Sequence, residues 1–360
     1  MLKQTPLHQL HLELGAKMVD FAGYHLPIYY PEGIIREHLH CRSHAGIFDI
    51  SHMGQCLITG DQAANALERL TVSDISGLKP GQQKYTLLTN QAGGVIDDII
   101  ISRLETGFMM VVNGACKDKD FRYLASQLSD QCQFNELDSR ALIAIQGPKT
   151  ADIIRRYSTL AADLSFMHLC ETELCGIKCI ISRSGYTGED GFELSVPNSD
   201  AEALARILLA ETEVNPIGLG ARNTLRLEAG LSLYGHELSE TITPIEAGLQ
   251  WVIKKGHNQF PGASKILEQI RLGAEIKRVG LMVDSKLPIR EESIILNEDA
   301  VEVGYVTSGS FSPSLGKPIA LALLNKHYTS VGTRLFAIVR DLKVPVTVTP
   351  LPFVPHHYHR

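Results

Sequence analysis

The stretch QAGGVIDDIIISR, residues 91–103, places two adjacent carboxylates, Asp97 and Asp98, at the start of an otherwise apolar run. The residues before it, YTLLTN (85–90), have the composition of a strand. QAGG between the two runs has the length and glycine content of a hairpin loop. The sequence therefore predicts a β-hairpin with both carboxylates on its second strand.

Strand periodicity predicts which residues accompany each carboxylate. Successive side chains point to opposite faces, which groups Val95, Asp97, Ile99 and Ile101 on one face and Ile96, Asp98, Ile100 and Ser102 on the other. Both faces are mostly apolar, so we expect both to be covered. A buried carboxylate needs a partner, a ligand or a raised pKa. Each aspartate either caps the Gly-Gly turn or serves a functional site.

The hairpin lies in a segment, residues 55–146, that is typical of an α+β module. Its helices are expected in DQAANALERLT, with Asp61 as the capping residue, and in KDKDFRYLASQL. Its other strands are expected in QCLITG, FMMVVN and ALIAIQG. After Ile276 the chain becomes a series of short strands separated by Gly, Pro, Ser and Asp, which predicts a β-barrel or sandwich.

Composition excludes several classes of protein. A chain of 360 residues suggests two or three domains. The formal net charge of -6 argues against non-specific nucleic-acid binding. Seven scattered cysteines without a CxxC pair favour free thiols in a reducing compartment, and the spacing of Cys170, Cys175 and Cys179 matches no common zinc pattern. We expect no membrane span and no signal peptide.

Two further stretches contain polar residues that could belong to a site. In SGYTGEDGFELSV (residues 184–196), Glu193 faces away from the apolar strand residues, toward either solvent or a pocket. The neighbouring Glu189 and Asp190 are most simply loop acids. In GLGARNTLRLEAGLSLYGHEL (residues 218–238), Arg222 and Arg226 lie one helical turn apart, where they clamp an anion or pair with acids. From the residue pattern alone, Met53 is expected to be a core residue. The C-terminal HHYHR is not assigned to a site.

These stretches, with GIFDISHMG (46–54) and VTSGSFSPSLGKPIALALL (306–324), resemble the T-protein family, the aminomethyltransferases of the glycine cleavage system. The resemblance extends over essentially the whole chain. It implies an α+β fold of three domains around a central folate channel, with a β-barrel-like C-terminal domain. The implied domains are a discontinuous first domain (1–54 and 148–255), an inserted α+β domain (55–147) and a β-rich domain (276–360).

The resemblance also implies a reaction and its partners. The methylene carbon passes from the aminomethyl-lipoyl arm of H-protein to tetrahydrofolate, the co-substrate. The products are ammonia, 5,10-methylenetetrahydrofolate and the reduced arm. We expect a cytoplasmic monomer with no metal, no nucleic-acid partner and no membrane partner.

Site residues follow from the family's motifs. Asp98, the second acid of GGVIDD, is the implied catalytic residue beside the N5/N10 edge of the folate, where its carboxylate would also stabilise a cationic carbon. Glu193 is expected to hold the pterin donors in a bidentate hydrogen bond. Asp97 would support the turn or face the second substrate. Five further residues are expected around the folate: Met53, Tyr85, Val111, Tyr186 and Arg222.

Three other functions fit the sequence less well. Folate-binding iron–sulfur assembly factors carry a KGC-type motif, which this sequence lacks. A demethylating oxidase would need a flavin domain, for which the chain has neither the length nor the fingerprint. A docking protein without catalysis would leave Asp98 and Glu193 unexplained.

Overall fold

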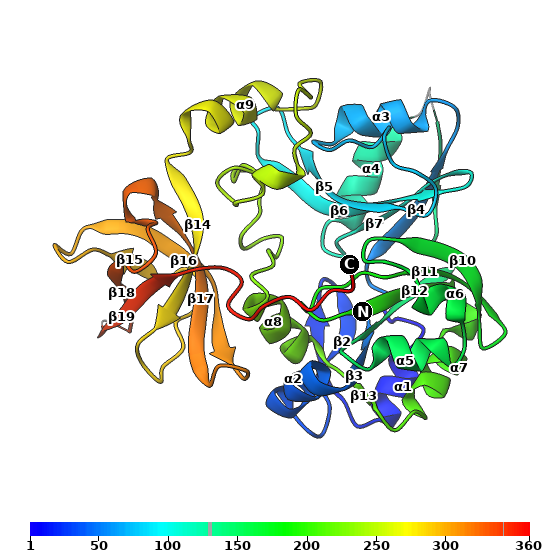
Figure 1. Cartoon of the computed structure of the whole chain (residues 1–360). Helices are drawn as coiled ribbons and strands as arrows, with labels where there is room; N and C mark the ends of the chain where they lie inside the picture. The colour runs from blue at the N-terminus through cyan, green and yellow to red at the C-terminus, as the bar shows by residue number, and fades with distance from the viewer. Residues whose placement is uncertain (129–131, 341) are drawn as a thin grey trace.

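The described part of the chain forms two open sheets, a small hairpin and a closed barrel (Figure 1). The computed structural model describes residues 1–128, 132–340 and 342–360. Helix α8 (Leu219–Glu228) and the segment after it lie between the sheets and the barrel, at the centre of the view. This mixture of helices and sheets with a barrel confirms the expected α+β class.

The first sheet has six strands and is covered on both faces. Its order is β10 (Leu169–Leu174), β11 (Ile177–Ser182), β12 (Gly191–Pro197), β9 (Arg140–Gln146), β3 (Ala45–Asp49) and β13 (Val214–Pro216), antiparallel except for the β13–β3 pair. Ile143 and Ile145 pack into one apolar cluster, whereas Leu142 and Ala144 pack into another with α8. This alternation is why the central strands are apolar throughout.

Helices cover each face of this sheet, and a hairpin precedes it. One apolar cluster includes residues of α1 (His8–Glu13), α5 (Thr150–Arg155), α6 (Thr159–Ala162) and α7 (Asn198–Leu209). The other includes residues of α2 (Ile34–Ser43) and α8. Strands β1 (Lys17–Phe21) and β2 (Tyr24–Tyr29) form the separate hairpin.

One strand of the expected inserted module belongs to this first sheet. Strand β9, the ALIAIQG run, was expected as a strand of the module of residues 55–146, but it does not join the sheet that contains the hairpin of that module. Its hydrogen-bonded neighbours are β3 and β12. Short apolar strands carry no information about their partner, so periodicity could not assign β9 to a sheet. The residue boundaries of the three domains stay a prediction.

The second sheet has five antiparallel strands and contains the opening stretch. Its order is β5 (Gln83–Thr89), β6 (Val95–Leu104), β7 (Gly107–Val112), β4 (Gly54–Thr59) and β8 (Gln133–Glu136). The β5–β6 pair confirms the predicted hairpin. Residues of α3 (Ala63–Leu70) and α4 (Lys117–Leu128) pack on one face. The expected cap by Asp61 is wrong, because Gln62 precedes α3 and makes no capping bond with its side chain.

A β-bulge interrupts the strand just before the two carboxylates. Thr89 pairs with Val95, and the residue before it, Leu88, pairs with Asp97. Ile96 therefore has no residue opposite it on β5. The bulge puts Ile96 in the cluster under α3 and α4 with Ile99, while Val95 packs against residues after position 238. The faces predicted for Val95 and Ile96 from strict strand alternation were therefore wrong, because a bulge changes the direction of the side chains.

Glycine at position 94 lets a distant segment approach this strand. A Cβ atom there would lie 1.8 Å from the carbonyl oxygen of Glu240. The next backbone N–H, of Val95, donates to the carbonyl oxygens of Ser239 (2.9 Å) and Ile242 (3.0 Å). Gly94 therefore serves close packing as well as the turn. Beyond this contact the chain continues through a 3₁₀ turn, η1 (Gln250–Val252), and α9 (Ala263–Leu272).

The last part of the chain closes into a barrel around its own apolar core. The strand order is β14 (Ile276–Val283), β17 (Lys317–Asn325), β16 (Glu302–Ser312), β15 (Ile294–Leu296), β18 (Arg334–Val339) and β19 (Leu342–Thr349), with η2 (Lys326–Tyr328) after β17. The expectation of a barrel or sandwich is settled in favour of the barrel. Leu227 of α8 packs against Ile319 and Leu321, which joins the barrel to the first sheet's helices.

The segment after the barrel returns to the first sheet (Figure 1). The backbone N–H of Val354 donates to the carbonyl oxygen of Glu228 at 3.0 Å, and that of His357 donates to the carbonyl oxygen of Gly188 at 2.8 Å. His357 also contacts Glu189 at 3.0 Å. The HHYHR end, set aside from the sequence, thus packs on the loop of residues 184–190. Among the residues that the structure describes, no helix is long and apolar enough to cross a membrane.

Candidate active site

All seven predicted site residues are half-buried, neither enclosed in the core nor on the outer surface. They come from both sheets and from α8: Asp98 (β6), Tyr85 (β5), Val111 (β7), Met53 (before β4), Tyr186 (between β11 and β12), Glu193 (β12) and Arg222 (α8). Partial exposure is expected of side chains that meet a ligand, because enclosed side chains have no open surface to offer.

Contacts join these residues in pairs, and the charges of Asp98 and Arg222 both act on Tyr186. The Tyr85 hydroxyl donates to Asp98 Oδ2 at 3.0 Å. The Arg222 guanidinium lies 4.8 Å from the ring centre of Tyr186, a cation–π distance. Met53 and Val111 pack against the same apolar cluster. The structure therefore brings the predicted residues into one region.

Asn113, directly after β7, holds both aspartates. Its Nδ2 donates to Asp97 Oδ1 at 2.9 Å and to Asp98 Oδ1 at 2.8 Å. Its backbone N–H donates to Asp97 Oδ2 at 3.0 Å. One side chain thus fixes the relative position of two carboxylates that leave opposite faces of the strand. Sequence reasoning missed Asn113, although a polar residue at the end of the apolar run FMMVV was visible.

Burial, as the larger cause, and the negative charge of Asp97 together raise the pKa of Asp98 to about 7. Hydrogen bonds from Tyr85 and Asn113 favour the charged form and oppose this rise. Asp98 therefore changes protonation near neutral pH, where an acid or base catalyst is most effective.

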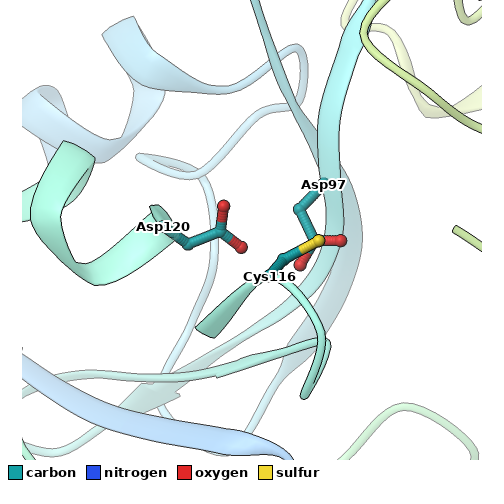
Figure 2. A group of neighbouring side chains, drawn as sticks. All are labelled: Asp97, Cys116 and Asp120. Carbon is teal, nitrogen blue, oxygen red and sulfur yellow. The ribbon is translucent and has the colours of Figure 1, made fainter. Parts of the chain in front are cut away.

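Asp97 lies on the enclosed side of the strand, in a group with Cys116 and Asp120 (Figure 2). Asp120 extends from α4 toward Asp97, and Cys116 comes from the turn before that helix. Ligand-type atoms of the three residues lie within 4.8 Å of one another. Burial and the charge of Asp97 raise the pKa of Asp120 to about 10. This is the one cluster with metal-binding atom types among the described residues.

Glu193 has hydrogen-bonding capacity left for a ligand. Ser184 Oγ donates to Glu193 Oε2 at 3.0 Å, and a carboxylate can accept about four hydrogen bonds. Burial raises the pKa of Glu193, while the nearby Arg222 charge opposes the rise. Of the two open interpretations for this side chain, solvent or a recess, the structure favours the recess.

The two arginines of α8 do not act as a pair. Arg226 is buried, with Nη1 donating to Glu237 Oε2 at 3.0 Å and Nη2 to Ser308 Oγ at 2.9 Å. Arg222 makes no hydrogen bond to the described residues and lies against Tyr186. A two-arginine clamp is excluded, because Arg226 is committed to linking α8 with the barrel.

Glu189 and Asp190 are loop acids, as expected, and they hold the loop that carries Tyr186. Glu189 is 2% exposed and accepts from Arg42 Nη1 at 2.8 Å. Asp190 Oδ1 accepts from Arg183 Nε at 2.9 Å. Opposite charges that are buried together in this way fix the loop's conformation, since removing either partner would leave an unpaired charge.

Trp251 is a second residue that sequence reasoning missed. Its ring stacks on Tyr85 with centroids 5.8 Å apart, yet 70% of its surface is exposed. The signal available was that it is the chain's only tryptophan. Large exposed aromatic rings beside half-buried polar groups are typical of binding regions.

The comparisons with known proteins agree with this arrangement. The family model described as the GCVT N-terminal domain matches residues 7–257. The model of the glycine cleavage T-protein C-terminal barrel domain matches residues 277–355. Together they span almost the whole chain, and the second match coincides with the closed barrel.

Individual relatives match over nearly their full length. The chain is 41% identical to the mitochondrial aminomethyltransferase of Dictyostelium discoideum, over 100% of this chain and 94% of the relative. It is 40% identical to an aminomethyltransferase of Listeria monocytogenes, over 98% of both. A crystal structure of glycine cleavage system aminomethyltransferase T from Bartonella henselae superposes with a TM-score of 0.96, at 39% identity and 100% coverage of both chains.

The chain therefore belongs to the family of glycine cleavage system aminomethyltransferases, transferases that use tetrahydrofolate. This confirms the family and the enzyme class expected from the sequence. The roles of individual site residues stay predictions.

Proposed function

We propose that the chain transfers the carbon of an aminomethyl group from the lipoyl arm of H-protein to tetrahydrofolate, with Asp98 as the catalytic carboxylate. Ammonia, 5,10-methylenetetrahydrofolate and the reduced arm are the products. The observation that carries the assignment is the environment of Asp98. It is a half-buried acid, held by Tyr85 and Asn113, with a pKa of about 7.

Asp98 would act in two ways. As a carboxylate it would stabilise the positive charge that develops on the transferred carbon as ammonia leaves. With a pKa near neutrality it would also accept the proton that the attacking folate nitrogen loses. Holding the nitrogen next to the carbon would supply a further part of the rate.

The remaining residues would bind the folate. Glu193 has acceptor capacity for the pterin's amino and N3 hydrogens, and Ser184 holds its carboxylate. Arg222 lies over the Tyr186 ring, has N–H donors without a partner among the described residues and would suit an anionic group. Four further side chains would surround the ring system: Met53, Tyr85, Val111 and Tyr186.

This donor and acceptor set fits a pterin better than a metal. Glu193 and Asp98 are half-buried acceptors, and the aromatic rings of Tyr85 and Tyr186 lie beside them. A flat ring with several N–H donors can use both features at once. No metal is included in the proposed reaction.

The wider setting of the enzyme is also proposed. The seven cysteines are all without disulfide bonds, which fits a reducing compartment, and we assign the chain to the cytoplasm. We further propose a monomer that meets lipoylated H-protein, with no nucleic-acid or membrane partner. The three domains would follow the boundaries expected from the sequence, except that β9 lies with the first domain's sheet.

The direct test is formation of 5,10-methylenetetrahydrofolate from tetrahydrofolate and aminomethyl-loaded H-protein. Wild type would be compared with Asp98→Asn and with Asp118→Asn, an exposed acid on α4. We expect product from wild type and Asp118→Asn, and a large loss in Asp98→Asn. Equal activity in all three would remove Asp98 from its role. A folded wild type that binds folate but forms no product would refute the transfer.

A further inference from the structure

Behind Asp98 lies a second pair of carboxyl groups that the proposed reaction does not use. Asp97 and Asp120 are both 0% exposed and point toward each other from β6 and α4 (Figure 2). Two negative charges in direct contact inside a core would repel strongly, because there is no water to screen them.

The hydrogen-bond donors around the pair are divided unequally. Asp97 accepts from the backbone N–H and from Nδ2 of Asn113. Neither oxygen of Asp120 has a hydrogen-bond partner among the described residues, although both are inaccessible to solvent. An ionised carboxylate without a single donor would be very costly. A neutral carboxyl, in contrast, is itself a donor and needs only a nearby acceptor, which Asp97 provides.

Lys119, whose charge acts on Asp120, does not neutralise it. Lys119 Nζ donates to the carbonyl oxygen of Ile96 (2.9 Å), to the hydroxyl of Tyr234 (2.9 Å) and to Glu240 Oε1 (3.1 Å). An ammonium group has three hydrogens, so its donors are all used. Its charge still acts on Asp120 from a distance.

We propose that Asp120 is a neutral carboxylic acid that donates its proton in a hydrogen bond to the carboxylate of Asp97, and that this fixed pair positions Asn113 and through it Asp98. Asp120 is then a positioning residue. The pair carries a single negative charge, which stays on Asp97, next to Asp98. No proton leaves the pair during turnover.

The groups that face Asp120 are consistent with a neutral acid. Asp97 and Asp98 from β6 act against its ionisation, and Lys119 acts for it. The thiols of Cys116 and Cys56 also lie close, and burial raises the pKa of both, so neither supplies a charge. The balance keeps the pKa of Asp120 near 10.

A bound metal is the alternative explanation of the cluster. It would use one oxygen from each aspartate and the sulfur of Cys116. Both Asp97 oxygens, however, already accept hydrogen bonds from Asn113, and tetrahedral sites need a fourth ligand. A proton on Asp120 gives that carboxyl a donor toward Asp97 and needs no further ligand.

Infrared spectroscopy of the whole protein tests the proton directly and does not depend on the proposed catalysis. At a pH midway between the pKa values of about 7 for Asp98 and about 10 for Asp120, Asp98 is mostly ionised and Asp120 is mostly neutral. We expect the carbonyl band of a buried, protonated acid in wild type, in Asp98→Asn and in Asp118→Asn, and its loss in Asp120→Asn. A wild type without the band, or a band that survives in Asp120→Asn, would overturn the proposal.

Two further measurements test the positioning role and the metal alternative. Asparagine keeps a neutral donor at position 120, so Asp120→Asn should retain most of the activity, whereas Asp120→Ala should lose about tenfold in kcat/KM, as when an outer hydrogen-bond partner is removed. The activity measurement rests on the proposed function, whereas the infrared measurement does not. Stoichiometric divalent metal in purified wild type, absent from Asp120→Asn, would overturn the proton pair.

The pH dependence of thermal stability is a further test of the neutral carboxyl, and it can also be measured in variants that fold poorly. A buried acid with a raised pKa keeps a proton that the unfolded chain releases. The contribution of Asp120 to wild-type stability should therefore fall as pH rises from about 4 toward 10. The melting temperature of Asp120→Asn should fall less over this range than that of Asp118→Asn. Parallel curves for the two variants would contradict a neutral Asp120.

Discussion

Strand β6 carries two adjacent aspartates whose side chains lie in different environments on its two faces. Asp97 is 0% exposed and lies against α4, where Asn113 and Asp120 surround its oxygens. Asp98, the next residue, is half-buried and shares its face with Tyr85. Both carboxyl groups have raised pKa values because of burial. Only Asp98 has an open side on which a ligand could approach.

The difference shows that burial by itself does not define a catalytic acid. Asp97 contributes a fixed negative charge, and that charge helps to bring the pKa of its neighbour to about 7. Asp98 contributes accessible atoms. Asp97 therefore adjusts the pKa of Asp98. Substitutions on the two faces of the strand should have different measurable effects.

The largest effect is expected from Asp98→Asn, which removes the proposed catalytic carboxylate while keeping the side chain's shape. We expect a loss of about 10²- to 10⁴-fold in the single-turnover rate of methylenetetrahydrofolate formation. Thermal stability should stay close to that of the wild type. A loss below tenfold would break the comparison, because Asp98 would then be no more important than its neighbour.

Asp97→Asn should mainly affect stability and the pH profile. Its new amide NH2 would face the N–H donors of Asn113, which we expect to lower the free energy of unfolding by about 1–3 kcal/mol. Loss of the negative charge should lower the pKa of Asp98, so the acid limb of the rate–pH profile moves to lower pH. Urea unfolding and the profile measure the two effects. Activity as low as in Asp98→Asn would refute the division of roles.

Tyr85→Phe should shift the same profile in the opposite direction. The Tyr85 hydroxyl donates to the charged form of Asp98, so its removal should raise the pKa of Asp98 and move the acid limb to higher pH. We expect a rate loss of roughly fivefold at neutral pH, which corresponds to one hydrogen bond. Limbs that move the same way in Tyr85→Phe and Asp97→Asn would mean that Asp98 does not control the profile.

Ile99→Val should have the smallest effect and concerns the enclosed face alone. Ile99 is 1% exposed in the cluster under α3 and α4. Loss of one buried methyl should lower the free energy of unfolding by about 1 kcal/mol. The transfer rate should not change. The half-buried Ile100, changed to Val on the open face, is the matched control and should cost less stability. Equal losses would show that both faces are equally well packed.

Local patterns in the sequence predicted local structure well. The hairpin of residues 85–102 and the helix from Lys117 to Leu128 appear as expected, because turn glycines and helical spacing are properties of neighbouring residues. The sheet to which β9 belongs depends on contacts between residues far apart in the chain. Its apolar composition suits either sheet, so no local signal could decide.

At the site, too, local sequence patterns predicted less than the contacts between distant segments determine. The resemblance placed seven residues that the structure brings into one region, whereas residue patterns alone had left Met53 in the core and Glu193 open. Asn113 and Asp120 were missed because their roles arise only when β7 and α4 lie against β6. The bulge at Ile96 was invisible for a related reason, since register depends on the partner strand.

The returning segment after the barrel has a consequence for biosynthesis. Residues 354–357 are translated after almost all of the chain, yet they bind the carbonyl oxygens of Glu228 and Gly188, beside the loop that carries Tyr186. On the ribosome, both sheets can form before this segment emerges. The Tyr186 loop, however, receives its last support only afterwards, so a nascent chain should acquire its fold before it acquires folate affinity.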